Sequence, residues 1–336
     1  MSPIEELLVS IGILSGIAGG LALLLVIADA YIANYGECTI TINKERKLTV
    51  TGGDTLLNSL GANKIFIPSA CGGRGTCAYC KVRVLDGGGP TLPMEDPYLT
   101  PEEHEAGVRL SCQVKVRQDL EIEIPDALFN IRQFRALVEK ITDLTYDIKE
   151  VRLKLIEPEK IKFRAGQYIQ LRSQPYEGCK EAVSRAYSAS SSPRKPDIVE
   201  MVIRLVPRGI CTTWVFEHLN EGDEVEFTGP FGEFYLSETD AEIIFIAGGS
   251  GFAPIKAILE GQPDEIDRRG AQFFFGAQAV RDLFYVDLMK EYEEAHPKFK
   301  FIPALSSPKP EDNWEGETGL ITEVLDRHIE DASGKE

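Results

Sequence analysis

The sequence predicts a multidomain protein of mixed α+β and α/β class, in which an N-terminal transmembrane helix precedes three folded domains. Three observations support this prediction. Residues 7–28 form an uncharged, strongly apolar run. Four cysteines lie within a region of short strand patterns. Further along, antiparallel-type strands give way to an apolar strand, a glycine-rich turn and a helix. The expected domain boundaries are 1–35, 36–126, 130–237 and 240–336.

Composition narrows the possible functions. A chain of 336 residues with 43% hydrophobic content can form two or three domains with apolar cores. The formal net charge of -17 argues against a nucleic-acid partner, because such a partner requires a basic surface. Seven cysteines are an odd number, and Cys38, Cys179 and Cys211 follow no motif. A disulfide framework is therefore not expected, and the free thiols fit a reducing compartment.

The run Leu7–Ala28 predicts a single-span membrane anchor. At ~1.5 Å per residue it is about 33 Å long, which is enough to cross the hydrocarbon core. Two glutamates precede it where a cleaved signal peptide would have basic residues. A buried soluble helix is the alternative, but the four glycines of the run favour a membrane helix. Basic residues occur only after the run, so the positive-inside rule places the bulk of the chain in the cytoplasm.

Cys71, Cys77, Cys80 and Cys112 predict an iron–sulfur cluster. Their spacing, C-x5-C-x2-C with a remote fourth cysteine, is one residue longer in its first gap than the plant-type [2Fe–2S] pattern. Three glycines between the first two cysteines fit a tight loop whose N–H groups point at sulfur, because glycine reaches the required φ values without steric cost. The alternative is a zinc site, which usually combines two C-x2-C pairs. Only Cys77 and Cys80 form such a pair.

The elements around these cysteines follow a recognisable order. The sequence predicts a strand pair around a polar turn (Cys38–Val50), a short helix (Asp54–Leu60) and the cysteine loop (Cys71–Cys80). A strand (Lys81–Leu85), a second helix that begins at Thr100 and a final strand pair (Gln113–Ile124) follow. This order resembles the β-grasp ferredoxin fold.

From residue 132 the sequence predicts an antiparallel β-barrel. The expected strands are Phe134–Asp143, Ile148–Leu155, Gln167–Arg172, Val199–Leu205 and Glu224–Thr228. The tetrapeptide Arg-Ala-Tyr-Ser at 185–188 lies among them and resembles the flavin motif of the ferredoxin–NADP reductase superfamily. In such a motif Arg185 pairs with the pyrophosphate, Tyr187 stacks on the isoalloxazine ring and Ser188 hydrogen-bonds near the flavin N5.

A second segment of this region looks like a phosphate-binding segment of the same superfamily. Gly209, Cys211 and Thr212 lie at the start of an expected helix, where backbone N–H groups bind anions. Gly229–Phe234 resembles the turn that closes the barrel. Because both phosphate-binding segments are present, the resemblance implies FAD and not FMN.

The last region predicts a parallel-sheet nucleotide-binding domain. The buried strand pattern Ala241–Ala247 runs into a G-x-G-x-x-P turn and then into a helix. This turn departs from the G-x-G-x-x-G dehydrogenase fingerprint, but its position between strand and helix is the expected one. It matches the reductase superfamily, which implies an NADH site at Gly248, Gly249, Ser250, Gly251, Pro254, Gly276 and Arg281. For Arg281, an ordinary solvated position remains open.

Taken together, these features resemble the flavin- and cluster-bearing component of the sodium-translocating NADH:quinone reductase family over essentially the whole chain. The resemblance rests on the anchor, the cysteine spacing, Arg185–Ser188, Gly248–Pro254 and Ala304–Ser306 with Pro310–Trp314. It implies an oxidoreductase of the inner (cytoplasmic) membrane that passes electrons from NADH through FAD and [2Fe–2S] to integral membrane subunits and finally to quinone. No catalytic residue beyond the cofactors is implied.

The chain also departs from this family. The family continues with a strand that ends in a Cys-Gly-Pro-like turn, whereas this sequence ends at Glu336 after a predicted helix, Leu320–Ile329. The nucleotide-binding domain is therefore expected to be incomplete at its C-terminus. Ser307 stands where the family usually has an aspartate. Two alternative functions stay open: a reductase component of an oxygenase system, and a tethered electron carrier that does not oxidise NADH.

Overall fold

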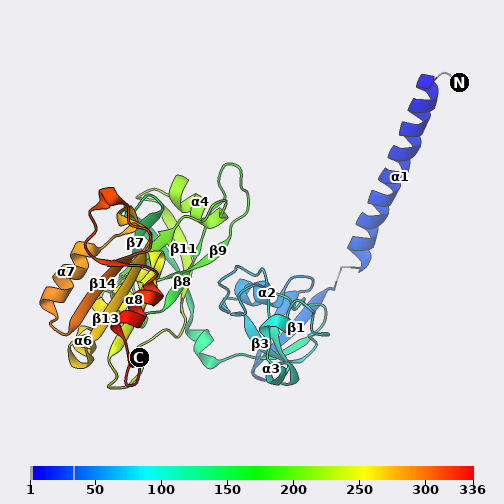
Figure 1. Ribbon diagram of the computed structural model, residues 1–336. Coiled ribbons are helices and arrows are strands. Elements are labelled where there is room, and N and C mark those ends of the chain that lie inside the picture. The colour runs from blue at the N-terminus through cyan, green and yellow to red at the C-terminus, as the bar shows by residue number, and fades with distance from the viewer. Residues whose placement is uncertain (1–2, 33–34) are drawn as a thin grey trace. The chain divides into compact units, whose positions relative to one another are not determined.

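The computed structural model describes residues 3–32 and 35–336 (Figure 1). The chain divides into two compact units, one made of residues 1–69 and 73–130 and the other of residues 70–72 and 131–336. The first unit contains one sheet, and the second contains an antiparallel sheet followed by a parallel one.

The N-terminal helix α1 spans Pro3–Ile32. Its side chains are described for residues 10–24 and 26, and all of these are exposed. Within the described residues, no helix meets the length and apolarity needed to span a membrane. The transmembrane span expected at Leu7–Ala28 therefore stays a prediction, and the side chains at both of its ends lie outside the described residues.

The first unit has a five-stranded mixed sheet in the order β2-β1-β5-β3-β4. The first and last strands in sequence, β1 and β5, pair in parallel, whereas β2, β3 and β4 join the sheet antiparallel. This arrangement agrees with the β-grasp expectation. The bounds are β1 (Glu37–Ile42), β2 (Arg46–Thr51), α2 (Leu56–Ala62), β3 (Lys81–Asp86), α3 (Pro101–Glu105), β4 (Val108–Leu110) and β5 (Leu120–Glu123).

The strand pair expected at Gln113–Ile124 is wrong in part. Only β5 forms there. Its predicted partner is replaced by an irregular segment that makes a single antiparallel bridge, between Lys115 and Thr55, next to the start of α2. The Leu56 N–H donates to the Val114 carbonyl at 2.7 Å, and the Val116 N–H donates to the Asp54 carbonyl at 2.9 Å. These backbone groups are therefore paired with the segment at the start of α2 and not with a second strand.

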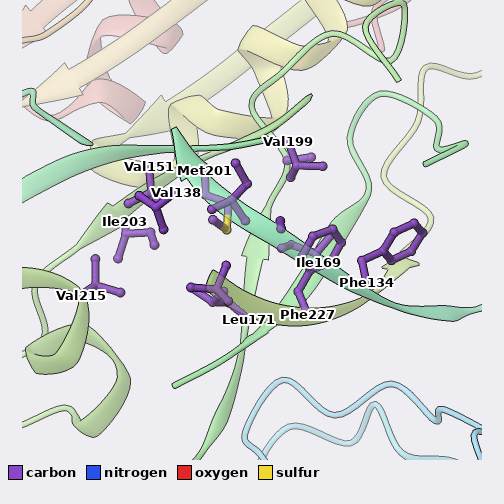
Figure 2. Close-up of a cluster of buried hydrophobic side chains, with 14 of the residues drawn as sticks. Phe134, Val138, Val151, Ile169, Leu171, Val199, Met201, Ile203, Val215 and Phe227 are labelled. Atoms are coloured by element: carbon purple, nitrogen blue, oxygen red, sulfur yellow. The ribbon is translucent and has the colours of Figure 1, made fainter. Parts of the chain in front are cut away.

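The second unit begins with a six-stranded antiparallel sheet that curves into a nearly closed barrel, in the order β10-β7-β6-β11-β8-β9. Beyond the end of β9, a bridge between Ala189 and Met201 links this edge to β10. Figure 2 shows the barrel core, which includes Phe134, Leu171, Met201 and Phe227. The bounds are β6 (Arg132–Asp143), β7 (Ile148–Glu157), β8 (Tyr168–Arg172), β9 (Ser184–Ser188), β10 (Ile198–Arg204), α4 (Ile210–Glu217) and β11 (Glu224–Phe231).

The same unit ends in a parallel sheet in the order β12-β13-β14-β15. Four helices connect or follow these strands, and phenylalanines fill much of the core beneath α5. The final residues lie beside β12, where the Ile244 N–H donates to the Glu336 carbonyl at 2.8 Å. The bounds are β12 (Ile243–Gly248), α5 (Phe252–Gly261), α6 (Pro263–Arg269), β13 (Ala271–Ala277), α7 (Val286–Ala295), β14 (Phe299–Leu305), β15 (Glu317–Thr318) and α8 (Ile321–His328). The predicted helix Leu320–Ile329 is therefore confirmed to within one residue at each end.

One ion pair in the first unit is fully buried. The Arg109 guanidinium contacts the Glu95 carboxylate at 2.7 Å, with side-chain exposures of 6% and 0%. The same carboxylate accepts the N–H groups of Leu92 and Leu110, each at 2.9 Å, and Arg109 donates to the Gly88 and Gly89 carbonyls. The pair therefore ties the loop between β3 and α3 to strand β4.

Replacing Arg109 alone should strongly destabilise the first unit. Arg109→Met leaves a buried carboxylate without its cation, which costs about 3–5 kcal/mol, whereas an exposed pair contributes about 0–1 kcal/mol. Native-state hydrogen exchange at the amides of β1 and β4 measures the unfolding free energy of this unit. The matched control is Arg83→Met, which breaks an exposed pair with Glu123. Equal losses in the two variants would contradict the expected role of burial.

Acid should weaken the same pair. Burial alone would raise the pKa of the Glu95 carboxyl, but hydrogen bonds from Arg109 and from two backbone N–H groups lower this pKa overall. A carboxyl whose pKa is lowered on folding contributes stability above its unfolded pKa of about 4.3. This contribution is lost as the pH falls below that value towards the folded pKa. In Arg109→Met the same acid titration should have a smaller effect on exchange.

Candidate functional site

The cysteine loop has the backbone conformation that its glycines predict. Gly72, Gly73 and Gly75 have φ values of 68°, 85° and 74°, a region that side chains with a Cβ rarely adopt. Ala78 also has a positive φ, of 59°. The loop ends at Cys80, directly before β3. Four positions with positive φ therefore wrap the chain tightly between the first and third predicted ligands.

The structure brings two of the four predicted ligands together. The sulfur atoms of Cys80 and Cys112 lie 3.3 Å apart, and both residues are buried. The Gln113 side-chain amide donates to the Cys112 sulfur at 3.2 Å, and the Ser111 N–H donates to the Cys80 carbonyl. The pKa of the Cys80 thiol is raised because Cys112 is its hydrogen-bonding partner and because it is buried. Two thiolates this close would repel each other, so the donor set fits a bound cationic centre.

The other two predicted ligands, Cys71 and Cys77, lie half-buried in the loop. Over the residues that the structure describes, no group of three or more histidine, cysteine or acidic side chains is close enough to hold a metal ion. The four-cysteine set therefore stays a prediction. All seven cysteines lie in the described part of the chain, and none of them forms a disulfide.

The predicted flavin motif forms β9 and pairs with β8 in a regular antiparallel register. Tyr187 lies opposite Ile169, and Ser188 lies opposite Tyr168. All five residues of β9 are half-buried, which leaves each with one accessible side. The Arg185 guanidinium donates to the Ser184 carbonyl at 2.8 Å. An arginine, a tyrosine and a serine are thus presented along one short strand.

The Tyr187 hydroxyl lies beside Cys211, which is in the first turn of α4. Burial raises the pKa of the Tyr187 hydroxyl, and the neighbouring Cys211 raises it further. Burial also raises the pKa of the Cys211 thiol. Both groups therefore stay neutral at physiological pH, and their contact joins the two predicted flavin segments, which are 24 residues apart.

The N-terminus of α4 has no side-chain cap, because its N-cap residue is Gly209. A Cβ at this position would lie 2.7 Å from the Thr212 hydroxyl, so the turn requires glycine. Thr212 itself donates to the carbonyls of Val206 and Gly209 at 3.1 and 3.2 Å. The Thr212 hydroxyl therefore holds the loop before the helix in shape. The N–H groups of the first turn of α4 could bind an anion.

The C-terminal ends of the parallel strands surround a cavity of about 350 Å³. Three of the predicted NADH residues line it: Gly248 and Gly249 at the end of β12, and Gly276 near the end of β13. A ligand site at this edge of a parallel sheet is the usual arrangement. Gly276 is required sterically, since a Cβ at this position would approach the Ile321 Cβ to 2.9 Å.

The remaining predicted NADH residues do not line this cavity. Ser250, Gly251 and Pro254 belong to the turn and the first part of α5. The guanidinium of Arg281 lies 5.0 Å from the centre of the Tyr146 ring, and Arg281 is exposed. Of the predicted NADH residues, the structure therefore brings only the three glycines together in this cavity.

Ten further residues line the cavity, and none of them was assigned to the NADH site from the sequence. They are Asp147, Ile148, Arg204, Ala277, Gln278, Asp282, Ser306, Gly319, Leu320 and Ile321. Asp147, Ile148 and Arg204 come from the barrel, and Arg204 donates to the Asp147 carboxylate at 2.8 Å. That hydrogen bond raises the pKa of Arg204. No local motif identifies Asp147, Ile148 and Arg204, because the fold brings them to the cavity from the turn before β7, from β7 and from β10.

Family models match three consecutive parts of the chain. A 2Fe-2S iron-sulfur cluster binding domain matches residues 40–117, an oxidoreductase FAD-binding domain matches residues 135–235, and an oxidoreductase NAD-binding domain matches residues 245–336. These ranges fall within the predicted domain boundaries. The first match favours an iron–sulfur centre over the zinc alternative.

Curated relatives are similar over nearly the whole chain. The F subunit of the Na(+)-translocating NADH-quinone reductase from Pseudomonas paraeruginosa is 38% identical, with 95% of this chain and 87% of the relative covered. The chain belongs to this reductase family. The corresponding F subunit of Neisseria gonorrhoeae is 34% identical, with 98% and 91% covered. As a member of this family, the chain is an oxidoreductase with 2Fe-2S, FAD and NAD domains.

Solved structures have the same order of folded parts. The chain is similar to the Amycolatopsis cytochrome P450 reductase GcoB with a TM-score of 0.68 and 28% identity, covering 89% of each chain. It is also similar to the ferredoxin reductase in carbazole 1,9a-dioxygenase, with a TM-score of 0.66 and 25% identity, covering 89% of this chain and 88% of the other. The architecture is therefore shared with a cytochrome P450 reductase and with the ferredoxin reductase of a dioxygenase.

Filling the cavity at Gly276 should weaken NADH binding. Gly276→Ala places a methyl group against Ile321, and overpacking of this kind costs about 1–3 kcal/mol. We expect the KM for NADH to rise about tenfold, which corresponds to about 1.4 kcal/mol. The FAD and cluster spectra should not change. The double variant Gly276→Ala/Ile321→Ala removes the clash and should recover most of the affinity, whereas an unchanged KM in Gly276→Ala would exclude this cavity as the NADH site.

Proposed function

We propose that the chain is the electron-input subunit of a Na(+)-translocating NADH:quinone reductase. The observation that supports this most is the presence of all three cofactor domains in one chain. Over 95% of its residues, this chain is 38% identical to an F subunit of the reductase. The chemistry that the bound groups supply is hydride acceptance from NADH by FAD and one-electron transfer by the [2Fe–2S] cluster. The electrons then go to membrane subunits and finally to quinone.

We assign the cluster to Cys71, Cys77, Cys80 and Cys112. The assignment is supported by the left-handed glycine positions of the loop and by the close, buried Cys80–Cys112 pair. The Gln113 amide donates to the Cys112 sulfur and would stabilise it as a thiolate.

For FAD, Arg185 would pair with phosphate, Tyr187 would pack against the ring system and Ser188 would hydrogen-bond to it. The proposal is supported by their placement on one half-buried strand. The second phosphate-binding segment would be formed by Gly209, Cys211 and Thr212. Its backbone N–H groups at the start of α4 would bind the phosphate, and the Thr212 hydroxyl would hold the loop in shape. The neutral Tyr187–Cys211 contact keeps a charge away from the ring.

For NADH, we assign the cavity lined by Gly248, Gly249 and Gly276. Gly249 lies in the turn between β12 and α5 and has a φ of 52°, a conformation that favours glycine. The other members of the proposed site are Ser250, Gly251 and Pro254 from the same turn, and Arg281.

We also propose that α1 is a single-span anchor in the inner (cytoplasmic) membrane, with the bulk of the chain on the cytoplasmic side. Large apolar side chains on its described part are 52% to 70% exposed: Ile11, Ile13, Leu14, Ile17, Leu21, Leu23, Leu24 and Val26. Its four glycines have no atom within 4 Å of an added Cβ. A helix with so much exposed apolar surface fits lipid and the helices of integral membrane subunits.

The alternative of an oxygenase reductase is not favoured. The curated relatives at 34% to 38% identity are named as F subunits of the quinone reductase, whereas the two reductases of oxygenase systems are 28% and 25% identical. The chain should be extracted from membranes by detergent together with integral membrane proteins. Affinity purification followed by mass spectrometry of the co-purified chains measures this. Release by high-salt washing without detergent would contradict both the anchor and its membrane partners.

An anaerobic NADH titration tests the electron route directly. Stoichiometric NADH should bleach both the flavin and the cluster absorbance of the detergent-purified chain. Cys77→Ala should lose the cluster absorbance and keep flavin bleaching, because only a cluster ligand is removed. The matched control is Cys179→Ala, which changes a half-buried cysteine outside the proposed ligand set. If dithionite reduced both centres but NADH reduced neither, the chain would be an electron carrier that does not oxidise NADH.

A further inference from the structure

A lysine is buried where the barrel meets the parallel-sheet lobe within the second unit. Lys256 lies on α5, five residues after the glycine-rich turn, and its side chain is only 8% exposed. Its ammonium contacts Glu200 at 2.8 Å, Glu260 at 3.2 Å and Glu150 at 3.9 Å. Burying a charge is costly unless it is paired, so a cation at this position requires these carboxylates.

The contacts of Lys256 reach both lobes of the unit. Glu200 lies on β10 and Glu150 on β7, which are barrel strands, whereas Glu260 lies on α5 itself. Burial alone would lower the pKa of Lys256, but the three carboxylates raise it overall. Lys256 is therefore a cation that is shared between the barrel and the nucleotide-binding lobe.

Lys256 is also tied to the strand that carries the flavin motif. Its ammonium donates to the carbonyl of Ser190 at 3.3 Å, two residues beyond Ser188. The Ser190 N–H in turn donates to the Glu200 carbonyl at 2.7 Å, and the Glu200 N–H donates to the Ser191 hydroxyl. The segment that follows the flavin motif is thus fixed to both Lys256 and its principal carboxylate.

A tyrosine completes the network on the nucleotide side. The Tyr285 hydroxyl donates to the Glu150 carboxylate, and the Lys256 ammonium lies 5.8 Å from the centre of the Tyr285 ring. Tyr285 also packs edge-on against Phe252, the first residue of α5. The start of α5, directly after the glycine-rich turn, is therefore linked through Tyr285 to Glu150, one of the carboxylates that contact Lys256.

We propose that Lys256 is a positioning residue for hydride transfer, which fixes the glycine-rich turn relative to the flavin motif. One covalent path of five residues leads from Lys256 to the turn, and one hydrogen bond leads from it to the segment after Ser188. The inference rests on the FAD and NADH sites proposed above. Hydride transfer requires the two rings to be aligned closely, and a displacement of about 1 Å can cost about 10²-fold in rate.

The test is stopped-flow reduction of the detergent-purified full chain by saturating NADH without oxygen. Lys256→Met keeps the side-chain length and removes the cation, and we expect flavin reduction to slow on the order of tenfold to a hundredfold. Reduction by dithionite, FAD content and the apparent Kd for NADH should stay as in the wild type. The long-wavelength charge-transfer absorbance of the NADH–flavin complex, which reports ring alignment, should weaken. Lys256→Arg should recover most of the rate.

The matched control is Lys290→Met, which removes an exposed lysine on α7 of the same lobe and should change nothing. If Lys256→Met fails to hold FAD, Lys256→Met/Glu200→Gln removes the carboxylate nearest to the lost ammonium and takes its place in the test. A wild-type rate and charge-transfer band in a variant that holds FAD would overturn the proposal. Loss of FAD from both variants would overturn it too, because Lys256 would then be a general folding residue. If the wild type itself is not reduced by NADH, the proposed function fails instead.

Discussion

The second unit depends on the two faces of β10. Side chains of a strand alternate between its faces, and here Val199, Met201 and Ile203 enter the barrel core (Figure 2). On the opposite face, Val202 packs into the core of the parallel-sheet lobe and Glu200 pairs with Lys256. One strand therefore serves two cores. This explains why β10 is buried at six consecutive positions although it lies at the edge of an antiparallel sheet.

The two faces of the neighbouring strand β7 also pack into different cores. Its barrel face carries Val151, Leu153 and Leu155, and its other face carries Ile148 into the lobe core. Glu150 follows Ile148 by two residues and faces the same side, where it meets Tyr285. The barrel and the lobe thus share a wall that is apolar at its centre and charged around Lys256. A shared wall of this kind holds the FAD-binding and NAD-binding domains in one arrangement more firmly than a flexible linker could.

Features that depend on local geometry could be predicted from the sequence. The glycines of the cysteine loop, the strand–turn–helix at Gly248 and the helix near Leu320 each require particular residue types at fixed spacing. Features that depend on distant partners could not be predicted. Residues 113–119 were expected to include a strand because nothing in their own sequence shows that the segment at the start of α2 takes up their hydrogen bonds. Asp147, Arg204 and Lys256 reach their sites only through the pairing of β7 with β10 and the packing of α5 on them.

The cavity at the strand ends is lined from both sides of the shared wall, by Asp147 and Arg204 of the barrel and by the glycines of the parallel sheet. A molecule bound there contacts both lobes at once. By mass action, such a ligand favours the state in which the two lobes are associated over any state in which they separate. Ligand binding in the cavity and association of the two lobes are therefore thermodynamically linked. A change that weakens the contact between the lobes lowers the affinity for the ligand. Conversely, a higher ligand concentration stabilises the contact between the lobes.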